Sequence, residues 1–214
     1  MSDTELELLG WPADGPTLRL DHRRFSYAGK FVMSSTGKAV VRTTDGPAGD
    51  DDDTDDASGP ETEGPDAHTA DYDTDVLAAV AFNEDRTDDS TLWLRYVTVR
   101  VDHRGEGLGP RLVRFVTDRA RERGYDRVRI AVNNPYSYEA LYRAGFGFTG
   151  EETGIAELVL ERPAEQSPGR YRAGLDVFAG RDDLTDDERD FVVEKRERGP
   201  PTAAGRDPDA DRHH

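Results

Sequence analysis

The sequence predicts a domain that mixes helices and strands, of the α/β or α+β class with a mixed sheet. Three observations indicate this. Segments with apolar residues at every second position alternate with segments that repeat at helical spacing. Turns rich in glycine and proline separate the segments. The chain has 214 residues, enough for one domain of ordinary size with tails.

The charge is strongly acidic. The formal net charge is −17, aspartate outnumbers glutamate, and the lysines are only Lys30, Lys38 and Lys195. One interpretation is an ordinary acidic protein. The other is adaptation to molar salt, because about 1 M salt shortens the Debye length to about 3 Å and screens such self-repulsion. The composition resembles the haloarchaeal type of acidic protein. Such a charge argues against broad binding to nucleic acid, because phosphate contacts need a clustered basic surface.

Other classes are excluded by simple counts. There are no cysteines, so disulfides, thiolate nucleophiles and cysteine-ligated metals are excluded. No apolar run approaches the roughly 18 residues of a membrane helix. The first residues are acidic and lack the apolar core of a signal peptide. We therefore expect a soluble cytoplasmic protein that binds neither membranes nor a structural metal.

The first half of the chain reads as short strands around an acidic insertion. Residues 1–16 contain a short apolar anchor and then a turn. Strands are predicted at 17–20, 30–34 and 38–43, the last two joined by a hairpin-like turn at 35–37. Residues 45–75 are rich in Asp, Gly and Pro and cannot bury enough surface to order, so we expect a disordered insertion. An acidic metal site is the alternative there.

The second half follows the order strand, strand, helix, strand, helix, two strands. Gly124 ends the first helix, and Asn134-Pro135 is typical of an N-cap followed by Pro at the first helical position. Thr185-x-x-Glu188 predicts a capping box. The expected segments are strands at 76–83, 91–101, 127–133, 146–149 and 155–161, and helices at 108–123, 135–145 and 185–198. Residues 162–169 read as a linker, and residues 171–179 are apolar enough to pack on the domain.

One strand-to-helix turn is rich in glycine. Val97, Val99 and Val101 alternate as in a strand, then Arg104-Gly105-Glu106-Gly107-Leu108-Gly109 leads into a helix. Such a turn exposes unpaired N–H groups at the positive end of the helix dipole, where phosphate binds readily. A tight connection without a ligand is the alternative. The loop has neither the Lys-Ser/Thr of a Walker loop nor the G-x-G-x-x-G spacing of dinucleotide binders.

A second motif follows about 30 residues later, where a strand leads through Asn to a short helix with Leu141-Tyr142-Arg143-Ala144-Gly145-Phe146. Together with Arg104-x-x-Gly107-x-Gly109, this resembles the GNAT superfamily of acetyl-coenzyme-A-dependent N-acetyltransferases. The resemblance covers residues 76–161. It implies a mixed, largely antiparallel central sheet flanked by helices, in which the strands ending near Val101 and at 127–133 splay apart around coenzyme A.

The resemblance also implies roles for residues. The loop containing Arg104, Gly105, Gly107, Leu108 and Gly109 would hold the pyrophosphate through backbone N–H groups. The strand around Val97 and Val99 would pair with the pantetheine arm. A strand-end asparagine would contact the cofactor. The family's usual spacing falls on Pro135, so Asn133 and Asn134 both remain candidates; Asn133 is preferred because capping already explains Asn134.

Tyr142 is the candidate catalytic residue. In the family this tyrosine often protonates the departing thiolate, a task suited to a phenol beside the sulfur. The alternative is a half-buried helix residue on the core side. The 91–101 strand carries no carboxylate that could act as a base; Glu84 and Asp85 are nearby in sequence, and a water chain is equally plausible.

The expected activity is acetyl transfer from acetyl-coenzyme A to a primary amine of a small molecule or peptide. The alternatives are a non-catalytic sensor or interaction module that binds acetyl-coenzyme A, or an acidic interaction protein without cofactor. No helical pattern lies between Thr17 and Thr43, where the family usually carries two helices. We expect an acetyltransferase-like domain over 1–163, an extension with one helix over 164–198, a disordered tail over 199–214, and a monomer or homodimer.

Overall fold

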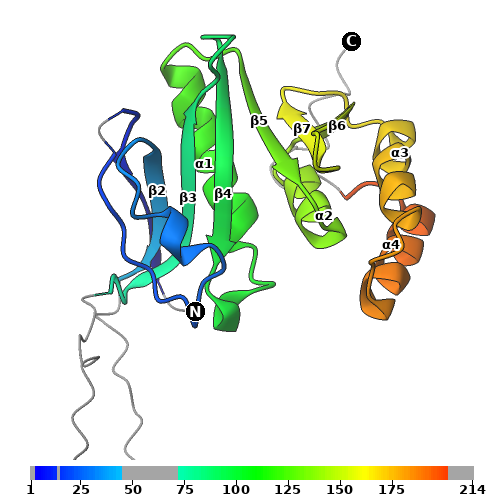
Figure 1. Cartoon of the computed structure of the whole chain (residues 1–214), viewed down its shortest axis with the longest axis horizontal. Coiled ribbons are helices and arrows are strands. Elements are labelled where there is room, and N and C mark those ends of the chain that lie inside the picture. The colour runs from blue at the N-terminus through cyan, green and yellow to red at the C-terminus, as the bar shows by residue number, and fades with distance from the viewer. Residues whose placement is uncertain (1–2, 14, 45–71, 202–214) are drawn as a thin grey trace, which may run out of the picture.

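The computed structural model describes residues 3–13, 15–44 and 72–201, arranged as Figure 1 shows. One seven-stranded sheet runs through this part in the order β1-β2-β3-β4-β5-β7-β6. Neighbouring strands are antiparallel except β4 and β5, which are parallel. The strands are β1 (Thr4–Gly10), β2 (Gly37–Thr43), β3 (Val76–Glu84), β4 (Thr91–Val99), β5 (Arg127–Val132), β6 (Gly147–Glu152) and β7 (Leu158–Arg162).

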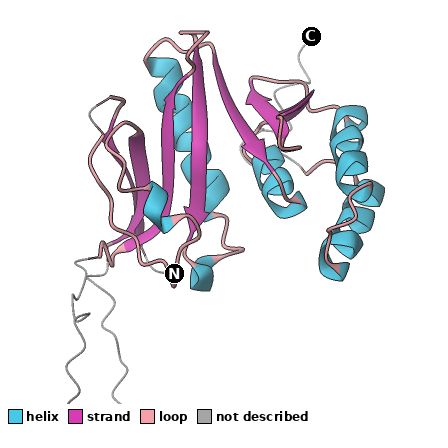
Figure 2. Ribbon diagram, viewed as in Figure 1, coloured by secondary structure: helices cyan, strands magenta, loops and turns pink. Residues whose placement is uncertain are grey.

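Helices flank this sheet (Figure 2). They are the α-helices α1 (Leu108–Glu122), α2 (Pro135–Arg143), α3 (Pro168–Ala179) and α4 (Asp186–Arg198), with short 3-10 helices η1 (Ala28–Lys30) and η2 (Val101–His103). None of the helices in the described residues is long and apolar enough to cross a membrane. The predicted mixed, largely antiparallel sheet flanked by helices is confirmed.

The two central strands separate part of the way along. Pairing between β4 and β5 covers Thr91 to Leu94 and Arg127 to Ile130, yet β4 continues to Val99. The same point carries a bulge, because β3 pairs with Tyr96 and then with Leu94, which leaves Arg95 without a β3 partner. A bulge bends its strand and increases its twist. The splayed central strands are thus confirmed, and Figure 1 shows the two strands diverging toward the end where α1 begins.

The N-terminal part differs from the prediction. Residues 4–10, expected as an apolar anchor, form the edge strand β1, antiparallel to β2. The strands predicted at 17–20 and 30–34, with their hairpin turn, are wrong. Residues 15–36 instead form an irregular segment whose apolar side chains cover one face of β2 and β3: Leu18, Leu20, Phe25 and Phe31 contact Val40, Ala79 and Ala81. The irregular segment takes its shape from these anchors and from the η1 turn.

The opposite face of the sheet carries the main core. Leu108, Leu112, Val116 and Ala120 of α1 lie at helical spacing against the alternate residues of β3 and β4. The 91–101 strand is shorter than predicted: it ends at Val99, and Val101 lies in η2 with half of its surface exposed. The strand ends there because the chain turns toward the glycine-rich loop.

The C-terminal extension holds two helices rather than the one expected. The predicted capping box at Thr185 and Glu188 opens α4, and Ser167 caps α3. Side chains of α3 join the main core together with α2 and β6: Tyr171, Leu175 and Phe178 of α3, and Val192 of α4, belong to the same cluster as Tyr138, Tyr142 and Phe148. Most of the expected acidic insertion (45–71) and of the tail (202–214) lies outside the described residues.

Candidate functional site

The glycine-rich loop enters α1 with its backbone exposed. Gly105 and Gly107 have φ of 88° and 81°, the left-handed region that favours glycine. Gly107 is the N-cap of α1, and no side chain caps the helix. Within the described part of the chain, the backbone N–H groups of Gly107, Leu108 and Gly109 find no acceptor. The loop therefore presents free donors at the positive end of a 15-residue helix.

A network of polar side chains contacts the glycine-rich loop. Arg100, almost fully buried, donates from Nε to Asp102 Oδ1 at 2.8 Å and from Nη2 to His103 Nε2 at 2.6 Å. Since a guanidinium has no acceptor, His103 Nε2 accepts, and its Nδ1–H is left to donate to Glu106 Oε2 at 3.0 Å. Arg104 donates from Nη2 to Ser26 Oγ at 3.1 Å, which ties the loop to the irregular segment. These contacts tie the loop to the end of β4 and to the irregular segment.

The β4 edge next to the loop carries the two predicted valines. Val97 and Val99 are half-buried against the main core, and both pair with β3. Past Leu94, no β5 residue pairs with this stretch of β4. Its backbone groups on the β5 side are therefore open to an extended ligand. The loop follows this edge along the chain, through η2, and a Cβ at Gly109 would lie 3.4 Å from Val99 Cγ2.

The two asparagines have different surroundings. Asn134 is the predicted N-cap of α2, and its Oδ1 accepts from Ser137 N–H at 2.8 Å. Asn133 is exposed, and its side-chain Oδ1 accepts only from Asn134 Nδ2, at 3.3 Å, among the described residues. The Asn133 carbonyl accepts from Arg181 Nη1 at 2.7 Å. Of the pair, Asn133 has the side chain available to a ligand.

Tyr142 lies deeper than a half-exposed helix residue. Its side chain is 0% exposed, its hydroxyl accepts from the Phe148 N–H at 3.0 Å, and it lies 3.4 Å from the Tyr138 hydroxyl. Burial raises the pKa of Tyr142, so its phenol stays protonated at neutral pH. A protonated phenol can act as an acid and not as a base. The catalytic role of Tyr142 stays a prediction.

The two carboxylates considered as bases are both occupied. Asp85 accepts from Thr87 Oγ1 and N–H, each at 2.7 Å, and from Trp93 Nε1; these hydrogen bonds lower the pKa of Asp85 to about 2. A carboxylate that acidic is a weak proton acceptor. Glu84 accepts from the Tyr125 hydroxyl at 2.6 Å. Asp85 is therefore poorly suited to take a proton from an amine, and one oxygen of Glu84 is already engaged.

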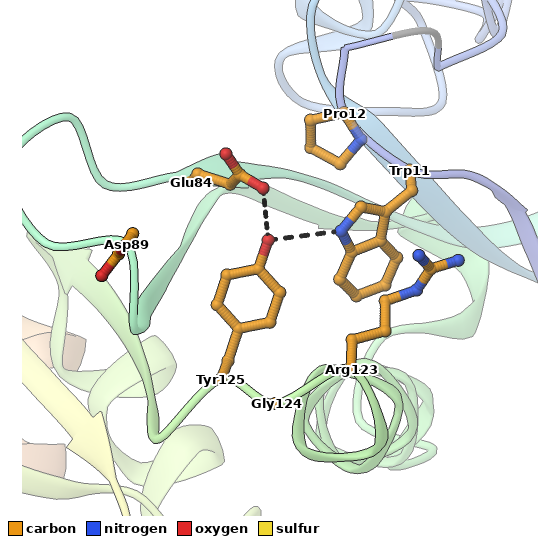
Figure 3. A pocket seen from close by; sticks show the side chains of 7 residues that line it. All are labelled: Trp11, Pro12, Glu84, Asp89, Arg123, Gly124 and Tyr125. Carbon is orange, nitrogen blue, oxygen red and sulfur yellow. Dashed lines mark hydrogen bonds between the residues drawn. The ribbon is translucent and has the colours of Figure 1, made fainter.

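A hollow in the described part of the structure lies elsewhere. It has a volume of about 390 Å³ and is lined by Trp11, Pro12, Glu84, Asp89, Arg123, Gly124 and Tyr125 (Figure 3). It adjoins the C-terminal end of α1, which is about 22 Å from the glycine-rich loop at 1.5 Å per residue over 15 residues. Figure 3 shows the Tyr125 hydroxyl between Glu84 and Trp11, and Arg123 over the indole. The hollow therefore lies toward the end where β4 and β5 are paired, away from the glycine-rich loop.

Sequence reasoning missed the bulge and the segment that faces it. A signal was present: Leu92 and Leu94 face the core at even positions, whereas Val97 and Val99 face it at odd ones. Such a change of parity within one strand indicates an extra residue. The contact between Ser26 and Arg104 spans 78 positions of sequence, and no local pattern points to it. No cluster of three or more potential metal ligands occurs among the described residues.

Comparisons with known proteins agree with this arrangement. The model of the acetyltransferase (GNAT) family matches residues 41–148, slightly more than half of the chain, and includes the glycine-rich loop and Tyr142. A search of curated proteins found no match.

Solved structures with some likeness include nourseothricin acetyltransferase, with 16% identity and a TM-score of 0.44 over 76% of this chain and 99% of that one. Another is a Bacillus subtilis acetyltransferase in complex with coenzyme A, with 13% identity and a TM-score of 0.40 over 59% and 75%. A third is the PaiA N-acetyltransferase of Thermoplasma acidophilum in complex with coenzyme A, with 15% identity and a TM-score of 0.36 over 42% of this chain and 54% of that one. On the extent of the family match, the chain belongs to the acetyltransferase (GNAT) family.

Proposed function

We propose that this protein is an N-acetyltransferase that takes acetyl-coenzyme A as its donor and acetylates a primary amine of a small molecule or peptide. One observation carries the proposal. In a member of the acetyltransferase (GNAT) family, the free N–H groups of Gly107, Leu108 and Gly109 lie at the start of α1, beside the gap between β4 and β5. Donors of this kind at a helix N-terminus bind phosphate oxygens.

The space around the loop suits a diphosphate. A Cβ atom placed at Gly105 or Gly107 would meet no heavy atom within 4 Å, so the loop opens outward. At Gly109 a Cβ would lie 3.4 Å from Val99 Cγ2. Glycine at the first two positions keeps the surface free for close approach of the backbone to a ligand. The residues present therefore fit the pyrophosphate of coenzyme A.

Few side chains are needed for the chemistry. Acetyl-coenzyme A would supply an activated acetyl group as a thioester. Backbone N–H groups of β4 beyond Leu94 can polarise a carbonyl that lies along them. The acceptor amine must be neutral to attack. Because Glu84 and Asp85 are both engaged, we propose that water accepts its proton.

Tyr142 is the proposed acid. The support is its place in the Leu-Tyr-x-x-Gly-Phe motif, with Gly145 and Phe146 at the family spacing. Its hydroxyl accepts from the Phe148 N–H, and that contact leaves its proton available for donation. Its raised pKa keeps the phenol protonated at neutral pH, so the proton is present when the thiolate forms.

A second candidate is a non-catalytic module that binds acetyl-coenzyme A. The observation in its favour is again Tyr142, because the Phe148 N–H already occupies the hydroxyl and the ring is fully enclosed. In this reading Tyr142 fixes β6 and has no part in proton transfer. Both candidates share the same glycine-rich loop and the same donor.

One experiment separates them. The purified chain is given acetyl-coenzyme A with a panel of primary amines, free thiol is followed, and coenzyme A binding is measured by calorimetry. The first proposal expects binding and amine-dependent thiol release. Binding without release from any amine would favour the module. No binding at all would contradict both.

We further propose that the protein works at high salt, as the charge of −17 with three lysines suggests. Self-repulsion of this size should destabilise the fold at low ionic strength. The melting temperature should rise steeply between low salt and molar KCl. A melting temperature that stays flat over that range would remove this proposal.

A further inference from the structure

A strip of aromatic and cationic side chains follows β4 at its bulge. We call it the bulge strip and define it as Trp93, Arg95 and Tyr96 of β4 with Tyr27 and Lys30 of the irregular segment. The contacts form two groups, which are joined by the adjacent β4 residues Arg95 and Tyr96. Arg95 Cζ lies 5.2 Å from the centre of the Trp93 ring, the Tyr27 and Tyr96 ring centres are 5.8 Å apart, and Lys30 Nζ is 6.0 Å from the Tyr96 ring.

The bulge sets which face the strip occupies. Leu94 and Val97 both pack into the core on the α1 side, while Tyr96 packs against the cluster under the irregular segment. Two residues between Leu94 and Val97 must therefore project from the face away from α1, and these are Arg95 and Tyr96. The bulge thus places a cation and an aromatic ring next to each other on one face.

The strip also lies where the gap between β4 and β5 begins. Pairing between these strands ends at Leu94 and Ile130, one residue before Arg95. If a donor arm runs along β4 from the glycine-rich loop, as the proposed function requires, its reactive end comes to this point. Side chains on the opposite face of β4 here, Arg95 and Tyr96, are then the first that an incoming acceptor meets.

The charge of the strip is unbalanced. Among the described residues, no carboxylate lies within ion-pair distance of Lys30 or Arg95. Arg95 donates from Nε to Asn83 Oδ1, and neither Nη atom has a partner in the described part. The neighbouring Arg129 of β5 differs, because Glu161 at 3.0 Å and Glu151 at 3.5 Å already pair with it.

Asp85 acts on Arg95 electrostatically, and its carboxylate is directed toward Thr87 and Trp93 Nε1. In a chain of net charge −17, an arginine held on a tryptophan face with its two terminal nitrogens free is arranged for an outside anion. Arginine presents a planar fork that matches a carboxylate with two parallel hydrogen bonds.

We infer that the acceptor is an amine that also carries a carboxylate, and that Arg95 binds this carboxylate while Tyr27 and Lys30 line its side. The inference rests on the proposed function and names the class of substrate for it. The rings of the strip already face cations, so a polyamine would meet repulsion rather than free aromatic faces.

Tyr27 supports a binding role. It has φ of 61° and ψ of 16°, a left-handed conformation that a bulky residue rarely adopts, and its side chain is 54% exposed. Strained residues of this kind cluster at ligand-binding sites. Ser26, its neighbour, contacts Arg104 of the glycine-rich loop. Ser26 and Tyr27 therefore connect the bulge strip to the proposed donor site.

The test compares amines that differ in one group, in KCl that keeps the fold intact. One arm pairs free amino acids with their amides. A second pairs an acidic peptide with the same peptide in which Glu is replaced by Gln, and a third uses spermidine. We expect kcat/KM for each carboxylate form to exceed its neutral partner about tenfold or more. The arm with the larger ratio tells whether a free amino acid or a peptide is the source.

Arg95→Gln should reduce that ratio about tenfold, mainly through KM, because a lost ground-state contact leaves kcat nearly unchanged. Calorimetry should show the same coenzyme A affinity in this variant. The matched control, Arg121→Gln on exposed α1 surface, should leave the ratio as it is.

Equal or better use of the amides or spermidine, or an unchanged ratio in Arg95→Gln, would overturn the inference and leave the proposed function standing. Absence of transfer to every amine in the three arms would overturn the proposed function, and the inference with it.

Discussion

The glycine-rich loop leaves backbone N–H groups without hydrogen-bond partners in the described part of the chain, whereas the tyrosine cluster of α2 and α3 buries its hydroxyls and bonds all of them. In the loop, the N–H groups of residues 107–109 lack acceptors within the described chain, and both left-handed glycines face open space. In the cluster, Tyr138, Tyr142 and Tyr171 are all 0% exposed. Their hydroxyls are bonded: Tyr138 to the Tyr171 carbonyl at 3.1 Å, Tyr142 to Phe148 N–H, and Tyr171 to Glu139 Oε2 at 2.5 Å.

The difference shows which kind of site can be recognised locally. The free N–H donors at the start of α1 depend on only six consecutive residues, 104–109, so they can be recognised from the local sequence alone. The surroundings of a tyrosine depend on what packs against it. Here Tyr171 and Gly174 come from α3, about 30 residues further along the chain. A motif that places a tyrosine on a helix therefore says little about the partners of its hydroxyl.

Tyr142→Phe gives the largest expected effect. If Tyr142 is the acid, turnover should fall about 10²–10⁴-fold, the range typical of general acid catalysis. If it only secures β6, the Phe148 N–H loses its acceptor and stability should fall by about 1–3 kcal/mol instead. Turnover on a working amine and thermal melts are measured together. Near-normal turnover would leave the cluster a purely structural one.

Gly107→Glu should come next. A side chain there must adopt the left-handed φ of 81° and brings a negative charge to the proposed pyrophosphate site. Coenzyme A affinity should fall about 100-fold, or about 2.7 kcal/mol. Gly154→Glu adds the same charge at another uncrowded glycine, one without a positive φ, and should bind normally. Equal affinities in calorimetry would place the phosphate site elsewhere.

A pair of alanine substitutions in α3 probes the cluster. A Cβ at Gly174 would lie 2.2 Å from the Tyr138 hydroxyl, whereas one at Gly169 would meet nothing within 4 Å. Gly174→Ala should cost about 1–3 kcal/mol through overpacking. Gly169→Ala should be neutral or slightly stabilising. Denaturant unfolding compares the two, and equal stabilities would mean that α3 can shift away from Tyr138 without cost.

The smallest expected effect is on alkaline stability. Burial raises the pKa of Tyr138 and Tyr171 far above the usual value of about 10. The folded state keeps both phenols protonated while the unfolded chain releases protons above about pH 10. Stability should therefore be complete below that pH and decline as pH rises above it, by at most about 1.4 kcal/mol per pH unit for each tyrosine. Tyr171→Phe should make the decline shallower, and Tyr136→Phe, at an exposed site, serves as control. A decline of equal slope in both variants would argue against the cluster as its source.

Much of the fold could be predicted between residues 76 and 161. Strand alternation, the glycine-rich turn and the Asn134 cap all act within a few residues, and each was borne out by the described elements. The splay of β4 and β5 followed from the resemblance. These features depend on local backbone preferences that the sequence states directly.

The N-terminal part could not be predicted as well. Glu5-Leu6-Glu7-Leu8 alternates as an edge strand does, but four residues beside an apolar tryptophan read equally as an anchor. Residues 17–34 contain apolar residues that suit strands, yet they pack as separate anchors because β2 and β3 already fill the sheet. That outcome depends on distant strands rather than on local pattern.

Placement of side chains at the site divides in the same way. The environment of residues 104–109 agrees with the expectation of an exposed phosphate-type loop, while their binding role stays a prediction. The enclosure of Tyr142 depended on an extension whose first helix was not predicted. The bulge strip was missed because Lys30 is brought to Tyr96 only by the irregular segment, and Arg95 changes face only at the bulge.

The bulge at Arg95 also limits which mutations β4 tolerates. Side chains alternate along a strand, so removing one residue between Leu94 and Val97 would reverse the facing of everything on one side of the deletion. Leu92 and Leu94 would turn outward, and Trp93 inward, unless the glycine-rich loop shifted instead. Substitutions here leave the facing of the neighbouring side chains unchanged, whereas insertions and deletions reverse it. The length of this short stretch should therefore be kept among descendants of the sequence.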